Sequence, residues 1–165
     1  CIGVDPYYLT YKSQQHGYKP EIILSGRKLN DSMAHVISNQ MIDGLEKENI
    51  DPTNSKILIL GLTFKENCPD IRNTKVIDLK EDLEKRGVEV DCFDPCAAPD
   101  EVSTNLGINM IESISSENYD GIVIAVAHQE FIKMGIEKIR SFGKDKCVIY
   151  DIKSLFPKEK TSLRM

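Results

Sequence analysis

Cys1 and Asp5 stand four positions apart at the start of the chain and carry two reactive groups. A cysteine thiolate is a strong nucleophile toward a carbonyl carbon, and a nearby carboxylate can act as a general base toward water. Each residue alone also has an ordinary structural interpretation. Single cysteines mostly pack inside proteins, and an aspartate before Pro6 is typical of a turn. The residues around Cys1 and Asp5 are therefore needed to choose between a catalytic and a structural role.

Lys65 and Arg72 form a second candidate group, because they follow the apolar segment 56–62. Such a continuous apolar segment is typical of a strand that is buried on both faces. No GxGxxG sequence follows it, so the turn that brings backbone amides close to a dinucleotide pyrophosphate is missing. Lysine and arginine can instead bind phosphate through their charge. We therefore expect an anionic ligand here and no NAD bound in the usual Rossmann manner.

The segment between residues 56 and 157 alternates strands with helices, which is typical of a parallel α/β sheet with right-handed crossovers. We expect a Rossmann-like domain over residues 55–165. Ligands of such sheets bind beyond the carboxyl ends of the strands. The expected strands are 56–62, 88–93, 108–111, 122–127 and 147–152, and the expected helices are 74–86 and 130–142.

Residues 1–54 are expected to form a separate unit that contains no strand. We expect a tyrosine-rich loop over residues 1–20. A long helix over residues 31–49 is predicted by apolar residues at four-residue spacing, and its methionine-rich face indicates an interface. The four residues that define this spacing are Met33, Ile37, Met41 and Leu45.

The composition excludes several classes of function. The net charge of −5 argues against a nucleic-acid partner, which would need a basic surface. No apolar run approaches the roughly 20 residues that span a bilayer, so no membrane partner is expected. The five cysteines are sparse and odd in number, which is typical of reduced thiols in the cytoplasm. Cys92 and Cys96 lack a second ligand pair, so we expect no metal site. The three histidines match no motif, although His128 follows a predicted strand.

Two long stretches carry a family resemblance. Residues 1–9, CIGVDPYYL, and residues 61–74, GLTFKENCPDIRNT, are followed by Phe93-Asp94-Pro95. Together they resemble the UDP-glucose/GDP-mannose dehydrogenase family over nearly the whole chain. The branch most similar to them comprises the bacterial enzymes that oxidise UDP-N-acetylglucosamine or UDP-N-acetylgalactosamine to uronic acids for surface polysaccharides.

The resemblance implies a two-step, NAD-dependent oxidation of the C6 alcohol of a UDP-sugar. It implies that NAD is bound mainly by an N-terminal domain that these residues do not contain, so the chain alone is expected to be inactive. It also implies a homodimer in which the long helix of residues 31–49 links the domains and pairs the subunits.

The same resemblance assigns roles to individual residues. Cys1 would form a thiohemiacetal and then a thioester with the substrate, and Asp5 would activate the hydrolytic water. The residues expected to contact NAD are Cys1, Ile2, Gly3, Val4 and Arg72. Those expected to contact the nucleotide-sugar are Phe64, Lys65 and Lys153. Lys153 departs from the arginine of glucose-specific relatives and lacks the bidentate fork of that side chain.

Two other functions have requirements that can be compared with this sequence. A non-catalytic module that binds nucleotide-sugars, or that serves in assembly, would need the same fold but no cofactor domain. A response-regulator receiver domain would need an acidic pair after the first strand to bind magnesium. The sequence there is Gly61-Leu62-Thr63, which disfavours the receiver domain.

Overall fold

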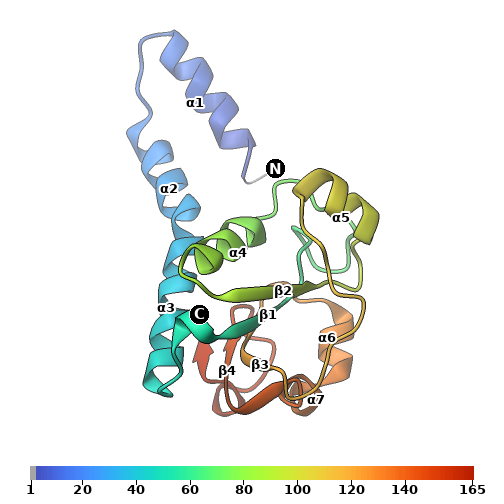
Figure 1. Ribbon diagram of the computed structural model, residues 1–165. Helices are drawn as coiled ribbons and strands as arrows, with labels where there is room; N and C mark the ends of the chain where they lie inside the picture. Colours follow the sequence, from blue (N-terminus) through green and yellow to red (C-terminus); the bar gives the residue numbers. More distant parts are fainter. Residues whose placement is uncertain (1–2) are drawn as a thin grey trace.

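The computed structural model of the protein describes residues 3–165, so Cys1 and Ile2 lie outside the described residues. Figure 1 shows two helices, α1 (Asp5–Gln15) and α2 (Glu21–Asp31), extending from an α/β body, with α3 (Met33–Lys47) lying along that body. None of the helices within residues 3–165 is long and apolar enough to cross a membrane.

The body is built on one sheet of five parallel strands in the order β2-β1-β3-β4-β5, which confirms the predicted Rossmann-like fold class. The chain begins with β1, adds β2 on one side, and then returns to add β3 on the other side. Ligands of open parallel sheets usually bind at such a reversal, here between β1 and β3. The strands are β1 (Lys56–Leu60), β2 (Glu89–Phe93), β3 (Tyr119–Ile124), β4 (Gly143–Asp151) and β5 (Leu163–Arg164).

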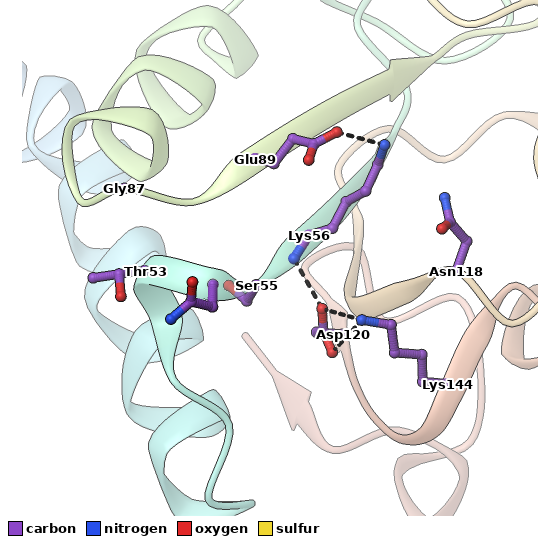
Figure 2. Close-up of a pocket in the computed structure, with 9 residues that line it drawn as sticks. Thr53, Ser55, Lys56, Gly87, Glu89, Asn118, Asp120 and Lys144 are labelled. Carbon is purple, nitrogen blue, oxygen red and sulfur yellow. Dashed lines mark hydrogen bonds and ion pairs between the residues drawn. The ribbon is translucent and has the colours of Figure 1, made fainter.

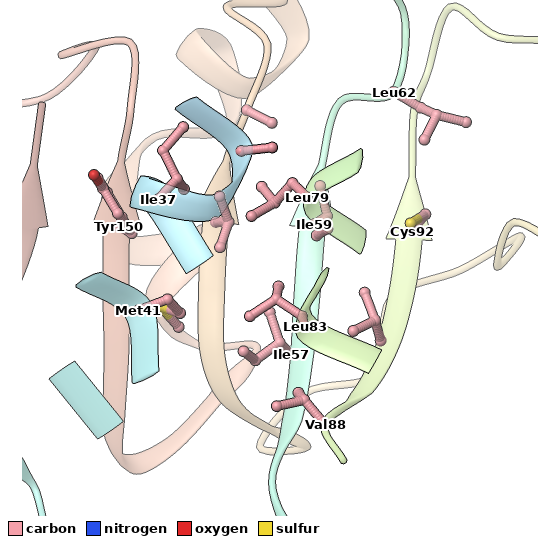
Figure 3. Packing of buried hydrophobic residues seen from close by; sticks show 14 of the residues in the cluster. Ile37, Met41, Ile57, Ile59, Leu62, Leu79, Leu83, Val88, Cys92 and Tyr150 are labelled. Atoms are coloured by element: carbon pink, nitrogen blue, oxygen red, sulfur yellow. The ribbon is translucent and has the colours of Figure 1, made fainter. Parts of the chain in front are cut away.

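Both faces of the sheet are covered, which explains why the central strands are mostly apolar at successive positions. Ile57 and Ile59 of β1 pack in the cluster beneath α3 and α4 (Val76–Lys85), and Leu58 and Leu60 pack on the opposite face. Figure 3 shows the first of these clusters, where side chains of α3 and α4 meet the strands. Each fully buried aliphatic side chain contributes about 2 kcal/mol to this packing.

The structure of the N-terminal segment differs from the predicted loop and agrees in part with the predicted long helix. The predicted loop over residues 1–20 is wrong, because residues 5–15 form helix α1. Pro6 lies in the first turn, where its missing N–H costs nothing, and Asp5 has a favourable charge there. The helix predicted over 31–49 is confirmed as α3, but a further helix, α2, precedes it and ends at Asp31.

The apolar face of α3 is covered within the chain itself. Met41 and Leu45 are completely buried in the cluster formed with the sheet. The methionine-rich face therefore packs on the core of the same chain, which corrects the prediction that this face is an interface. Large exposed apolar side chains lie instead on α1 and α2, where Tyr8 and Ile22 are 71% and 90% exposed.

Two expectations for the α/β body need correction, and one helix was not expected. The helix predicted over 130–142 is interrupted at Gly135, which has φ +77°, and is divided into α6 (Gln129–Met134) and α7 (Ile136–Arg140). The predicted strand 108–111 is not formed, because only the N–H of Ile111 bonds to β2, at the Cys92 carbonyl. Helix α5 (Pro99–Leu106) was not predicted. Short 3₁₀ turns, η1 (Pro52–Asn54) and η2 (Lys158–Lys160), complete the described elements.

Gly61 makes the closest backbone approach at the ligand edge of the sheet. A Cβ atom there would lie 2.5 Å from Cβ and 2.9 Å from the backbone N of Val126, and Gly61 has φ +97°. We expect Gly61→Ala to destabilise the fold by about 3 kcal/mol, from overpacking and backbone strain together. Urea unfolding of the chain measures this change.

Gly107→Ala is the matched control for that substitution. Gly107 also has positive φ, +66°, but a Cβ there would meet no atom within 4 Å. It should therefore lose only about 1 kcal/mol from the left-handed backbone. Equal losses in the two variants would contradict the close contact between the loops that follow β1 and β3.

Candidate functional site

The N-terminal motif is attached to the edge of the sheet at which α4 begins. Cys1 and Ile2 lie outside the described residues, and Asp5 is the exposed first residue of α1. The Tyr7 hydroxyl donates to Oδ2 of Asp31, and Oδ1 of Asp31 lies 3.2 Å from Nζ of Lys75, the N-cap residue of α4. The Tyr7 hydrogen bond, assisted by Lys75, lowers the pKa of Asp31 despite partial burial. These contacts link α1 through Asp31 to the start of α4.

The loop after β1 presents the two residues predicted to contact a nucleotide-sugar. Phe64 is 48% exposed and Lys65 is exposed. Among residues 3–165, the ammonium group of Lys65 makes no hydrogen bond or ion pair with a neighbouring side chain. Its backbone is well held, because Oγ1 of Thr63 donates to the Lys65 carbonyl at 3.1 Å and the Phe64 N–H donates to the Asp70 carbonyl at 3.1 Å. A fixed loop thus carries an unpaired cation and an exposed ring.

Arg72 lies in the same loop but is already paired. Its Nε donates to Oδ1 of Asp70 at 2.9 Å and its terminal nitrogen donates to Oδ2 at 2.6 Å, in a bidentate fork. The hydrogen bonds from Arg72 lower the pKa of Asp70 to about 2, so the carboxylate is charged at neutral pH. The Arg72 side chain is 82% exposed. A cofactor phosphate that reached Arg72 would have to share it with Asp70, and the predicted contact with NAD stays a prediction.

Lys153 follows β4 on the same carboxyl edge of the sheet. The buried Asp151 side chain accepts the Phe156 N–H at 2.9 Å and shapes the loop from which Lys153 projects into solvent. Because β3 alone separates β1 from β4, the loops that hold Lys65 and Lys153 start about 10 Å apart. The topology therefore brings both predicted substrate lysines to one edge.

Asp94 and His128 form a buried junction that sequence reasoning did not assign to the site. Oδ2 of Asp94 accepts the N–H groups of Leu62 at 2.6 Å and Thr63 at 2.8 Å, and it lies 3.1 Å from Nε2 of His128. Oδ1 of Asp94 accepts two further backbone N–H groups, from Cys96 and Ala97. Asp94 thus joins the loops after β1, β2 and β3. The sequence signal that could have indicated this junction was an aspartate directly before Pro95 at the end of a strand.

The charge of Asp94 is maintained by its donors. Burial opposes ionisation, but the hydrogen bonds from His128 and from backbone N–H groups outweigh it and hold the pKa of Asp94 far below its usual range. The carboxylate is therefore an anion at every physiological pH.

Asp94, Cys96 and His128 place three ligand-type atoms within 4.8 Å of one another, a grouping that could hold a metal ion. Both carboxylate oxygens are already filled by the donors described above, and Nδ1 of His128 accepts the Asn67 N–H at 3.0 Å. Burial, followed by the charge of Asp94, raises the pKa of the Cys96 thiol, so it stays protonated at neutral pH. These groups act as a hydrogen-bonded junction in this arrangement.

The usual ligand crevice between β1 and β3 is filled by the protein itself. Gly61 abuts Val126, and the His128 side chain between the two loops is completely buried. A dinucleotide pyrophosphate therefore does not fit there. A ligand at this edge would have to lie outside this junction.

A surface pocket at the opposite, amino-terminal edge of the strands is a weaker candidate. Figure 2 shows its charged residues paired with one another, with Lys56 bonded to Glu89 at 2.6 Å and Lys144 to Asp120 at 2.8 Å. These pairs satisfy the charges of the strand ends, and parallel sheets bind ligands at the other edge.

Comparisons with known proteins show which family the chain is similar to. The UDP binding domain of the UDP-glucose/GDP-mannose dehydrogenase family matches residues 58–158. The chain is 53% identical to UDP-N-acetyl-D-glucosamine 6-dehydrogenase of Salmonella typhi and 48% identical to the protein of the same name from Pseudomonas aeruginosa. Both matches cover the whole chain but only 39% of the relative.

A solved structure shows the same relation. UDP-D-ManNAc dehydrogenase from Pyrococcus horikoshii superposes with a TM-score of 0.77 at 26% identity. The match covers 96% of this chain and 35% of that protein. The chain therefore spans well under half the length of the relatives it matches.

Proposed function

Because the chain belongs to the UDP-glucose/GDP-mannose dehydrogenase family, we propose that it is the nucleotide-sugar-binding, C-terminal part of an NAD-dependent dehydrogenase. Its proposed substrate is a UDP-N-acetylhexosamine, and its proposed product is the corresponding uronic acid for surface polysaccharide. An enzyme of the relatives' length that contains this chain is called the whole enzyme below. We propose that it is a homodimer.

The observation that carries the proposal is the fixed loop with its unpaired lysine. Lys65 projects from the carboxyl edge of a parallel sheet and has no carboxylate partner among the described residues, whereas Arg72 nearby is neutralised by Asp70. An uncompensated cation held in place is suited to a diphosphate. Phe64 beside it offers an exposed ring to the remainder of a nucleotide-sugar. Lys153, on the same edge, supplies a second cation for the substrate.

The described residues do not fit an NAD pyrophosphate, because the crevice at the strand-order reversal is filled. We therefore place NAD mainly on residues outside this chain, with Gly3, Val4 and Arg72 contacting it from this side. When bound, NAD would supply the oxidant for both steps. The chemical steps that we assign to this chain are the covalent attack by Cys1 and the activation of water by Asp5.

Cys1 supplies the covalent chemistry in this proposal. After the C6 alcohol has been oxidised to the aldehyde, the Cys1 thiolate adds to its carbonyl carbon and gives a thiohemiacetal. Oxidation of that adduct gives a thioester, and water then displaces the thiolate to release the acid. Asp5, in the first turn of α1, is assigned the removal of a proton from that water.

Lys65→Ala tests the substrate-binding half of the proposal. A charge-assisted contact is worth roughly 1.5–3 kcal/mol, so kcat/KM for the UDP-sugar in the whole enzyme should fall about tenfold to a hundredfold. Lys133→Ala, which removes an exposed lysine of α6, is the matched control and should change nothing. An unchanged kcat/KM in Lys65→Ala would show that Lys65 is a solvated surface residue with no role in substrate binding.

A further inference from the structure

The loop that carries Phe64 and Lys65 is fixed on both sides of these residues by one buried side chain. Nδ1 of His128 lies 3.0 Å from the N–H of Asn67, and Nε2 lies 3.0 Å from Oγ1 of Thr63. His128 is completely buried at the start of α6. It therefore contacts the loop one residue before Phe64 and two residues after Lys65.

The hydrogen-bonding groups around His128 are consistent with only one neutral form of the ring. The Asn67 N–H is a donor, so Nδ1 must be the unprotonated acceptor. Nε2 then carries the proton and donates toward Oδ2 of Asp94 at 3.1 Å. The Thr63 hydroxyl gives its own proton to the Lys65 carbonyl, so its oxygen is free to accept from Nε2 as well. Every polar atom of the ring is thus used in holding loops.

The side chain of Asn67 completes the link between this loop and α6. Asn67 has φ +55°, and its Oδ1 accepts the N–H of Gln129 in the first turn of α6 at 2.8 Å. The thiol of Cys96 also lies 3.4 Å from Nδ1 of His128, on the same side as the Asn67 amide. The Nδ1 side of the ring therefore sets the position of the loop, whereas the Nε2 side is shared with Asp94.

We propose that His128 is a positioning residue for substrate binding: through Nδ1 and the Asn67 amide it holds Lys65 where it meets the diphosphate of the nucleotide-sugar. This inference rests on the proposed function, and it assigns that role to a residue that does not itself touch the substrate. His128 acts through Lys65, so its effect should appear in substrate affinity and should depend on Lys65 being present.

Two substitutions distinguish the roles of the two ring nitrogens of His128. Nδ1 is bonded to Cγ, as is Oδ1 of asparagine, so His128→Asn retains an acceptor for the Asn67 N–H and loses the donor that Asp94 and Thr63 share. Thr63 is still held by its backbone N–H, which donates to Asp94. The glutamine amide ends one bond farther out, near the position of Nε2, so His128→Gln retains the donor to Asp94 and loses the acceptor. In the whole enzyme, His128→Gln should raise KM for the UDP-sugar about tenfold, whereas His128→Asn should stay within about threefold of the wild type. KM for NAD should change in neither variant.

A double variant distinguishes positioning from a general loss of stability. If His128 acts through Lys65, the effect of His128→Gln on KM should largely disappear when Lys65 is already alanine. Effects that multiply independently would contradict the proposal, as would equal KM values for His128→Gln and His128→Asn. Should His128→Gln fail to fold, Asn67→Gly keeps the positive φ but removes the side-chain link to Gln129, and it should raise KM in the same Lys65-dependent manner.

The wild-type control separates this inference from the proposed function. If the wild-type whole enzyme oxidises no UDP-sugar, the proposed function itself is wrong. If it oxidises one and all three substitutions leave KM unchanged, the function stands and the role of His128 is wrong.

Discussion

Replacing Cys1 by alanine should abolish uronic acid formation by the whole enzyme, with a loss of at least about 10³-fold, while some oxidation of the alcohol persists. The first oxidation needs a base and the bound oxidant but no covalent bond to the protein. The second needs a nucleophile that attacks an aldehyde and later leaves, and a thiolate does both well. Product analysis for the uronic acid, together with NADH release in a single turnover, measures the two steps separately.

Cys68→Ala is the matched control, because Cys68 is a partly exposed free thiol in the loop after β1. It should leave acid formation unchanged. Asp5→Asn should slow hydrolysis, so that a thioester adduct accumulates on Cys1 and is visible by mass spectrometry of quenched reactions. Wild-type yields of uronic acid from Cys1→Ala would remove Cys1 from the mechanism.

Asp94→Ala should cause the largest loss of stability in the α/β body, about 4 kcal/mol. The substitution leaves four backbone N–H groups without their acceptor and removes one of the two acceptors of the His128 Nε2–H. Each unsatisfied buried donor costs about 1–3 kcal/mol when water cannot replace the partner. For a chain of this size, the melting temperature should fall by roughly 10 °C. Asp43→Ala, at an exposed position of α3, should change it little.

The pH dependence of that loss follows from the pKa of Asp94. Its pKa is depressed in the folded state, and an unfolded aspartate titrates near about pH 3.9. The stabilisation is therefore fully present above about pH 4–5 and is lost as the pH falls toward the folded-state pKa. The difference in unfolding free energy between wild type and Asp94→Ala should shrink between about pH 5 and pH 2. A constant difference over this range would contradict an ionised Asp94 as the acceptor.

The sheet could be predicted because its signal is local. Runs such as the one over β1 are apolar at successive positions, which only a strand covered on both faces requires. The predicted strand 108–111 was wrong because Ile108 is buried as part of a loop that merely contacts β2. The single helix predicted over 130–142 was wrong because the backbone of Gly135, with its positive φ, cannot continue an α-helix.

The candidate site was predictable only in part. Phe64 and Lys65 follow a recognisable strand, so their place at its carboxyl end could be predicted from sequence order alone. The junction of Asp94 with His128 could not, because the two residues are 34 positions apart and meet only through the parallel pairing of β2, β1 and β3. Arg72 was predicted to contact NAD, and its pairing with Asp70 depends on a turn whose conformation the sequence did not reveal.

The most direct test of the account is to incubate the whole enzyme with NAD and a panel of UDP- and GDP-sugars and to follow NADH absorbance. We predict that a UDP-N-acetylhexosamine is oxidised with two NADH formed per sugar, because conversion of an alcohol to an acid removes two electron pairs. GDP-sugars should give no signal. The absence of NADH with every UDP-sugar would contradict the account, and one NADH per sugar would contradict the covalent role of Cys1.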